Sequence, residues 1–503
     1  MDNRYIGKKL KYGTQSTVII VIVIAIVVIL NVIVSMLMQR SALKVDLTSN
    51  KMYAISAETE DYVKGLNTEV KIIVCGNELD LRNNSYYNYI VNLLDKYASF
   101  NDKVSVEYVD IVDEPEKISK YIEMGSTDIA EGSIIVTSGN KIRVNSIDNL
   151  INFENNYATG SVTPVSLNVE GVITPNILYV TNANPKRVAV CSSNYSSYAQ
   201  AAISSLMQLM YDNAYEFKYD ENDKLVNIDL NTMELNPEEY DLVILAAPTV
   251  DYGLTAIEKI NNYLLNGGQY GKNVIYLADF KQPTLPNIEA FLASWGMRVE
   301  RSLIEEKDET LAQSVQIAIA SQPVACPIGN VVAETYKIDA AKPVVLPGSR
   351  PITLLWAEND NYVTESILQN SGTAVTNSLS DGALVQQSGS PKISVALSTR
   401  RISDSTGYTE NYSKVMVFGT ANLADPYVLA NKSYANNEFM INAINTLVGK
   451  EDSGFTYVSK NFATDGITVS TKAKNNIRNF LLIVVPAIVI AGGVIVFIRR
   501  RNR

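Results

Sequence analysis

The chain has 503 residues, which is too long for one compact core and, at about 150 residues per domain, indicates two or three domains. It contains no histidine, so Ser-His and Cys-His nucleophile pairs, HExxH zinc sites and a histidine general base are all excluded. Its net charge is −10 although basic residues cluster at both ends, so the segment between them is strongly acidic and a poor partner for nucleic acid.

Two uncharged, apolar segments have the length of membrane spans. Residues 17–38 and 480–498 contain 22 and 19 residues, and at about 1.5 Å per residue each approaches the thickness of the hydrocarbon layer, about 30 Å. For the first segment a cleaved signal peptide is the alternative, but the apolar stretch is longer than usual and no A-x-A site follows. Close to the two segments the tails carry eight Lys and Arg residues and the body side carries six, so we expect residues 1–16 and 499–503 to be cytoplasmic and residues 39–479 to be extracytoplasmic.

The first extracytoplasmic domain, residues 39–180, is predicted to be a thioredoxin-like α/β unit. Ser56 is a predicted helix N-cap, with acidic residues in the turn that follows. The periodicity of the apolar residues then predicts, in order, a strand at 69–75, a helix at 85–98, a strand at 103–110, a helix at 115–124 and a hairpin at 133–145 that turns at Gly139-Asn140.

Cys75 ends the first predicted strand, where a thioredoxin places its reactive cysteine. The chain continues with Gly76, Asn77 and Glu78, so the second thiol that dithiol exchange needs is missing. Cys191 and Cys326 are the other cysteines, and three such separated residues cannot build a disulfide framework or a cysteine-rich zinc site. We interpret Cys75 as a small apolar residue that closes a strand.

Residues 186–450 are predicted to form a second α/β domain, built on a doubly wound sheet. The strand at 240–248 is a near-continuous apolar run, which is typical of a parallel sheet covered on both faces. Further strands are predicted at 186–191, 273–279, 393–398 and 414–419, with helices at 254–268, 285–296 and 436–449. The helix at 254–268 is expected to end at Gly267 or Gly268 in a left-handed cap. An insertion of mixed β character occupies about 301–392, and a polar linker, 451–479, leads to the second span.

Three aspartates that follow strands of the second domain are candidate site residues. Doubly wound sheets bind ligands beyond the carboxyl ends of their strands, and the loops there carry Asp251, Asp279 and Asp425. Carboxylate pairs can hydrolyse bonds without histidine, whereas the alternative interpretation is that each aspartate caps a helix or turn. The stretch 267–273 does not match a phosphate-binding loop in spacing or position, so we expect no ATP hydrolysis and no cofactor.

The segment at 45–59, VDLTSNKMYAISAET, resembles the D-L-T-x-x-K-x-Y-x-L/I-S signature of GldG-type proteins, an auxiliary family of ABC transport systems associated with gliding motility. Later segments, the final span and the arginine tail are similar to the same family in order. The signature residues are Asp46, Leu47, Thr48, Lys51, Tyr53 and Ser56. The closing segments also resemble the GIFT domain, a glutamine-amidotransferase-like sheet whose active members need a Cys-His pair, which this chain lacks.

The resemblance implies a non-catalytic, two-pass subunit in the cell membrane that works with a separate ABC ATPase and a separate polytopic permease. In such a subunit the signature residues orient the extracytoplasmic domains on the first helix or, alternatively, contact the permease directly. Gliding itself does not follow from the resemblance. An extracytoplasmic ligand sensor, an envelope scaffold and a hydrolase that uses the three aspartates are the alternative functions.

Overall fold

The fold is mixed α/β, as predicted, and is known from a computed structural model. The described residues are 29, 51–124, 129–156, 161–191, 197, 199–218, 226–308, 325–326, 328–378, 391–403, 410–450 and 459–462. The predicted spans, apart from Ile29, and the signature residues Asp46, Leu47 and Thr48 lie outside them. None of the helices in the described ranges combines the length and apolar character that a bilayer crossing needs.

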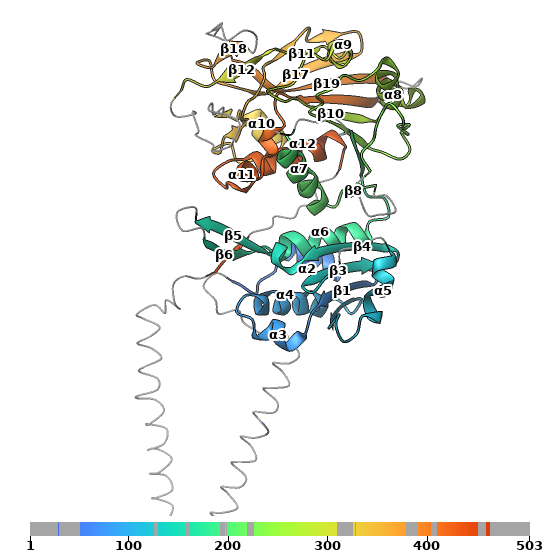
Figure 1. Cartoon of the computed structure of the whole chain (residues 1–503), viewed down its shortest axis with the longest axis vertical. Coiled ribbons are helices and arrows are strands. Elements are labelled where there is room, and N and C mark those ends of the chain that lie inside the picture. The colour runs from blue at the N-terminus through green and yellow to red at the C-terminus, as the bar shows by residue number, and fades with distance from the viewer. Residues whose placement is uncertain are drawn as a thin grey trace, which may run out of the picture.

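The first domain is a four-stranded sheet with helices on both faces (Figure 1). Its strand order is β2-β1-β3-β4, with β1 parallel to β2 and β3 antiparallel to its neighbours. The strands are β1 (Val70–Cys75), β2 (Val104–Val109), β3 (Ser133–Ser138) and β4 (Lys141–Ser146). The helices are α2 (Ala57–Lys64), α3 (Glu78–Asn83), α4 (Tyr87–Phe100), α5 (Glu116–Glu123) and α6 (Val169–Thr181).

The apolar pattern explains why the first sheet is covered on both sides. Alternate residues of β1 face opposite directions, so Ile72 and Val74 pack with α4 and α6, whereas Ile73 and Cys75 pack with α5. The predicted helix and strand positions between 56 and 145 are confirmed within a few residues, including the two-residue turn between β3 and β4.

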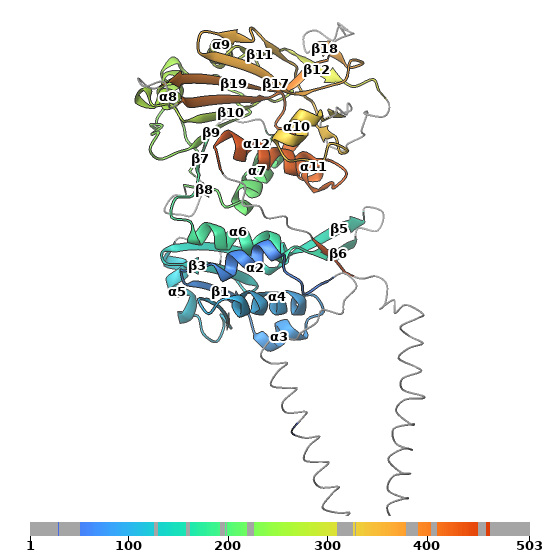
Figure 2. The ribbon, with the colours of Figure 1, turned by 180° about the vertical axis from the view of Figure 1, so that it is seen from behind.

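The chain returns to the first domain after completing the second, which the sequence did not predict. A hairpin of β5 (Ile151–Asn156) and β6 (Ser161–Leu167) extends from the first domain, and β21 (Lys460–Asn461) pairs with β6 in antiparallel orientation. Figure 2 shows β5 and β6 from behind, projecting beside α6. A part of the predicted linker 451–479 is therefore a strand of the first domain.

The second domain is built on a ten-stranded sheet. The strand order is β11-β15-β19-β20-β10-β9-β7-β8, and β16 and β17 attach through β19. The parallel strands are β7 (Arg187–Cys191), β8 (Glu216–Phe217), β9 (Leu242–Ala246), β10 (Asn273–Leu277) and β20 (Glu410–Phe418). The antiparallel extension consists of β11 (Met297–Val299), β15 (Ile352–Leu354), β16 (Glu358–Asn359), β17 (Tyr362–Gln369) and β19 (Ile393–Ser403). The short strands β12 (Ser302–Glu305) with β18 (Val375–Ser378), and β13 (Ala325–Cys326) with β14 (Val344–Val345), form separate pairs.

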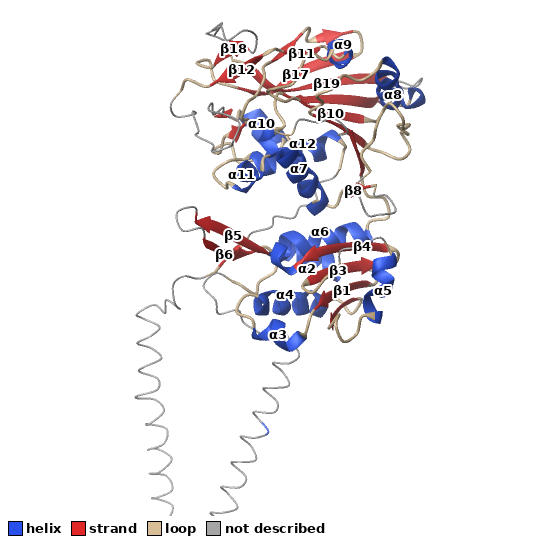
Figure 3. Cartoon of the chain, in the orientation of Figure 1, coloured by secondary structure: helices blue, strands red, loops and turns tan. Residues whose placement is uncertain are grey.

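Helices cover both faces of this sheet (Figure 3). One face packs against α7 (Gln200–Asp212), α10 (Asn330–Thr335), α11 (Pro426–Ala430) and α12 (Asn436–Leu447), and the other against α8 (Leu254–Leu265) and α9 (Pro286–Ser294). All five residues of β9 are buried, and they alternate between the two apolar cores, which confirms the predicted two-sided burial.

Two details of the second domain differ from the predictions. Helix α8 ends at Asn266, which adopts the left-handed conformation (φ 48°) one residue before Gly267. Asparagine tolerates this conformation, and its side-chain Nδ2 donates to the Tyr270 carbonyl at 2.8 Å. The predicted insertion is also not separate from the sheet, because its strands β15 and β17 pair with β19 and widen the sheet.

Candidate functional site

The two ends of the described body meet on helix α4. The Tyr53 ring lies 5.4 Å from the Tyr89 ring, and the Phe462 ring lies 6.1 Å from Tyr89 and 5.0 Å from Tyr86. We call residues 51–56 and 459–462, together with the face of α4 beneath them, the end junction. The segments that lead toward the two predicted spans therefore leave the body from the same domain.

Hydrogen bonds made by the signature residues Lys51, Tyr53 and Ser56 fix the backbone of residues 51–56. Lys51 is exposed, with a positive φ of 49°, in a turn closed by a bond from Ala54 N–H to the Lys51 carbonyl. Lys96 on α4 donates from Nζ to the carbonyl oxygen of Tyr53 at 2.9 Å. Ser56 caps α2, as predicted, by accepting a bond from the Thr59 N–H at 3.2 Å.

A buried carboxylate connects Ser56 to α6. Glu170, in the first turn of α6 and 7% exposed, accepts bonds from the Ser56 hydroxyl and from the Ser56 N–H at 3.1 Å. The Ser56 hydroxyl is thus donor to Glu170 and acceptor from Thr59 at once. The Glu170 carboxylate thus links the first turn of α6 to the N-terminal end of α2. Glu170 was not among the predicted residues, since nothing near it in the sequence indicates a partner 114 positions away.

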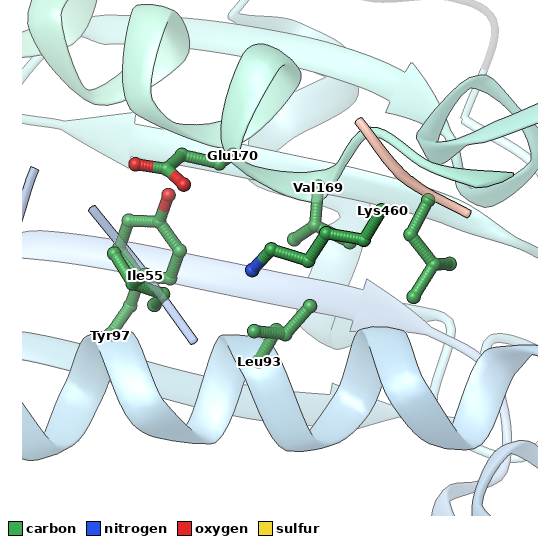
Figure 4. A pocket seen from close by; sticks show the side chains of 7 residues that line it. Ile55, Leu93, Tyr97, Val169, Glu170 and Lys460 are labelled. Carbon is green, nitrogen blue, oxygen red and sulfur yellow. The ribbon is translucent and has the colours of Figure 1, made fainter. Parts of the chain in front are cut away.

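A small cavity beside Glu170 is lined by both ends of the body. Its volume is about 10 Å³, enough for about one water molecule. Figure 4 shows the Glu170 carboxylate next to the hydroxyl end of Tyr97, with the Lys460 side chain extending toward the same space between α4 and α6. The Tyr97 hydroxyl also bonds to Thr174 at 2.6 Å. The cavity is too small for an organic substrate. We therefore interpret the end junction as a structural contact between the two ends of the body.

Two of the three predicted aspartates cap helices. The Asp251 carboxylate accepts bonds from the N–H groups of Asn287 at 2.8 Å and Ile288 at 3.2 Å, in the first turn of α9. Asp425 caps α11 by accepting from the Tyr427 N–H at 2.9 Å, and burial raises the pKa of its carboxyl. The two carboxylates therefore cap different helices, and α9 and α11 cover opposite faces of the sheet.

The third aspartate belongs to a buried polar cluster at the carboxyl end of β10. Asp279 is 1% exposed, and its charge acts on the buried guanidinium of Arg350. Burial lowers the pKa of Arg350, and the neighbouring charges of Asp279 and Glu289 oppose that shift. Arg350 donates from Nε to the Glu300 carbonyl at 2.8 Å and from Nη1 to Gln282 at 3.2 Å.

A segment of the insertion, residues 344–350, contacts the residues that follow the carboxyl ends of β10 and β20. All seven of its residues are buried. Arg350 N–H donates to the Gly419 carbonyl at 2.9 Å, the Thr420 hydroxyl donates to the Pro347 carbonyl at 2.8 Å, and Asn436 exchanges two bonds with the backbone of Val345. A Cβ atom on Gly419 would overlap the Arg350 carbonyl oxygen. The chain itself thus occupies strand ends at which sheets of this kind bind ligands.

The cysteines lack the properties of reactive thiols. Cys75, Cys191 and Cys326 are all free and buried. Burial raises the pKa of Cys75 to about 11 and that of Cys326 to about 12, which disfavours the thiolate that a nucleophile or metal ligand needs. Within the described ranges, no group of three Cys, Asp or Glu side chains is placed to hold a metal ion.

Comparisons with known proteins reach only part of the chain. A domain of unknown function (DUF7088) matches residues 49–146, a range that includes Lys51, Tyr53 and Ser56 and ends with β4. No curated protein matches the sequence. A solved structure of Agd3, a novel carbohydrate deacetylase, is 13% identical over 47% of this chain and 29% of its own, with a TM-score of 0.25. The chain thus spans less than a third of that protein, and this likeness carries no argument about fold or activity.

Proposed function

We propose that this chain is a non-catalytic auxiliary subunit of an ABC-type transport system, anchored in the cell membrane by segments 17–38 and 480–498. Both termini then lie in the cytoplasm, and residues 39–479 lie outside it. The observation that carries the proposal is the end junction, in which the segment that bears the GldG-type signature packs with the returning strand β21 on α4. A body held at one domain by both ends is suited to stand on a partner in the membrane.

The strand orders support the finer fold assignments within this proposal. The order β2-β1-β3-β4, with β3 antiparallel, is that of a thioredoxin-like domain. In the second domain the order β8-β7-β9-β10-β20 corresponds to the 2-1-3-4-5 order of doubly wound sheets. The segment 344–350 lies against the ends of β10 and β20, which supports a role in binding and positioning instead of catalysis.

Affinity purification of the tagged full-length chain from solubilised membranes tests the proposal. We expect an ATPase and a polytopic permease to co-purify in comparable amounts. Recovery of neither, under conditions in which other transporter complexes survive, would refute the assignment. Protease treatment of intact cells with a permeable envelope provides the topological control, because it should degrade residues 39–479 and spare both tails.

Two variants distinguish whether the signature residues contact the permease directly or orient the extracytoplasmic domains. Lys51→Ala removes an exposed side chain, whereas Ser56→Ala removes the cap of α2 and the bond to Glu170. If the signature contacts the permease, Lys51→Ala should reduce co-purification more than Ser56→Ala. If the signature orients the domains, the opposite order is expected.

A further inference from the structure

A large cleft lies between the two domains and has no role in the proposed function. Its volume is about 910 Å³, within the range of sites that bind extended ligands. One wall consists of Asn140 and the whole of β4, Lys141–Ser146. The opposite wall is formed by Ser204, Met207, Gln208 and Tyr211, whose spacing places them on one face of α7. Figure 1 shows α7 and β4 on facing sides of the boundary between the domains.

Strand β4 is an edge strand, and part of its backbone points into the cleft. It ends the order β2-β1-β3-β4, with no further strand on its outer side within the described chain. The bond from Ile147 N–H to the Gly132 carbonyl, together with the β3–β4 register, makes Asn145 and Arg143 the residues that bond to β3. The backbone groups of Ile142 and Val144 therefore point away from β3. One of these outward groups already has a partner, because the Val144 carbonyl accepts a bond from the Tyr211 hydroxyl of α7 at 3.4 Å.

Two buried side chains of β4 present unused hydrogen-bond donors at this wall. Arg143 is 4% and Asn145 is 5% exposed, and both line the cleft. Arg143 Nε and Asn145 Nδ2 have no hydrogen-bond partner among the described residues. Leaving such donors unpaired in a buried position is unfavourable, so a ligand that supplies acceptors is favoured there. The unused groups are donors only, which selects a ligand with carboxylate or carbonyl oxygens.

The Arg143 guanidinium is held in place from both domains. It lies 3.8 Å from the Tyr179 ring of α6 and 3.6 Å from the Tyr211 ring of α7, and its Nη2 donates to the Tyr215 carbonyl. The ionisable groups nearby are Asp212 and Lys450 in the second domain and Lys141 on β4. In this position Nε is a buried donor without a hydrogen-bond partner among the described residues.

We propose that the cleft binds an extended peptide segment of another protein as an additional strand beside β4, with an acidic or amide side chain facing Arg143 and Asn145. A strand edge opposite a helix face is suited to this mode, in which main-chain bonds provide affinity and side chains provide specificity. Because Glu131 and Glu216 also line the cleft, one acidic side chain fits better than a run of them. The inference does not depend on the transport partners.

Fluorescence anisotropy with the full-length protein in detergent micelles tests this inference. The probe is a short labelled peptide of alternating Thr and Val with one central Glu. We expect it to bind, and we expect N-methylation of the amides on one edge to weaken binding about tenfold for each bond lost. Replacing the central Glu by Lys should weaken binding as well, because the Lys side chain cannot accept a bond from Arg143.

A pair of variants locates the binding to β4. Val144→Pro removes an N–H that points away from β3, so the ladder within the sheet keeps its bonds. Val144→Ala keeps the N–H and controls for the loss of the branched valine side chain. We expect the proline variant to bind the probe about tenfold more weakly than the alanine variant. If Val144→Pro does not fold, as judged by thermal unfolding, the N-methylated probe decides the question.

Three results would overturn the proposal. They are no binding of the probe at millimolar concentration, equal binding of the N-methylated probe, and equal affinities of the two Val144 variants. Binding of an acidic oligosaccharide in place of the peptide would assign the cleft to a sugar and would equally refute strand addition.

Discussion

The end junction of the first domain and the carboxyl edge of the second sheet both bury ionisable groups, but with different results. In the end junction, Glu170 connects two helix termini beside half-buried aromatic rings that remain near the surface. At the second sheet, Arg350 and Asp279 lie where a fully buried segment meets the ends of β10 and β20. The comparison shows that the buried carboxylate of the first domain joins two helix ends near the surface, whereas the polar groups of the second domain are enclosed by the chain itself.

Replacing Arg350, the buried arginine at the carboxyl edge of the second sheet, should have the largest effect on stability. Arg350→Ala leaves the Glu300 carbonyl without its donor, removes one of the two donors to Gln282 and takes away a positive charge that interacts with Asp279. We expect a loss of about 3–5 kcal/mol in the free energy of unfolding. Denaturant unfolding followed by tryptophan fluorescence measures it directly, because both tryptophans, Trp295 and Trp356, lie in the second domain.

Arg298→Ala is the matched control for this prediction. Its side chain is 56% exposed and pairs with Glu300 at the surface, so its loss should change stability by about 0.5 kcal/mol or less. Equal losses of stability from Arg350→Ala and Arg298→Ala would contradict the view that buried polar contacts stabilise the carboxyl edge of the second sheet.

Breaking the end junction should have the next largest effect. Glu170→Ala removes the acceptor of two bonds from Ser56 and should cost about 2 kcal/mol, since the partner groups are left half-buried and unpaired. Hydrogen exchange of α2 and α6 should increase while the tryptophan signal stays unchanged. Glu60→Ala, which removes only an exposed pair with Lys64, is the control and should leave the exchange of α6 as it was.

The two capping aspartates should each contribute less. Asp251→Ala and Asp425→Ala should lower stability by about 1 kcal/mol, and the asparagine variants should restore most of it because asparagine also accepts from backbone N–H groups. Thermal unfolding measures both series. Loss of a cellular phenotype in a folded Asp→Asn variant would instead favour the carboxylate hydrolase.

The smallest expected effect is a dependence of stability on pH at the boundary between the domains. Burial raises the pKa of Asp212 from its ordinary value of 3.8 to about 6. The folded chain therefore binds more protons than the unfolded chain between these values, so this contribution to stability is complete below pH 3.8 and is lost as the pH rises through 6. Asp212→Asn should flatten the change in melting temperature across that interval, measured against Glu216→Gln on the same cleft.

The sequence was most informative where the information is local. The continuous apolar runs that predicted β1 and β9, the spacing of Ile90, Leu93, Leu94 and Tyr97 on α4, and Ser56 as an N-cap all depend on neighbours within a few residues. The missing histidine excluded whole classes of catalysis by composition alone. The loops that carry Asp251 and Asp425 were also correctly placed after strands, although the pattern could not choose between catalysis and capping.

Tertiary structure decided everything that depends on distant partners. The bond between Ser56 and Glu170, the pairing of β21 with β6, and the segment 344–350 over the strand ends each join residues far apart in the chain. A local pattern shows which face of an element is apolar, but it does not show which surface will cover that face. Only the folded chain determines that the segment 344–350 lies against the ends of β10 and β20, whereas β4 lies beside an open cleft.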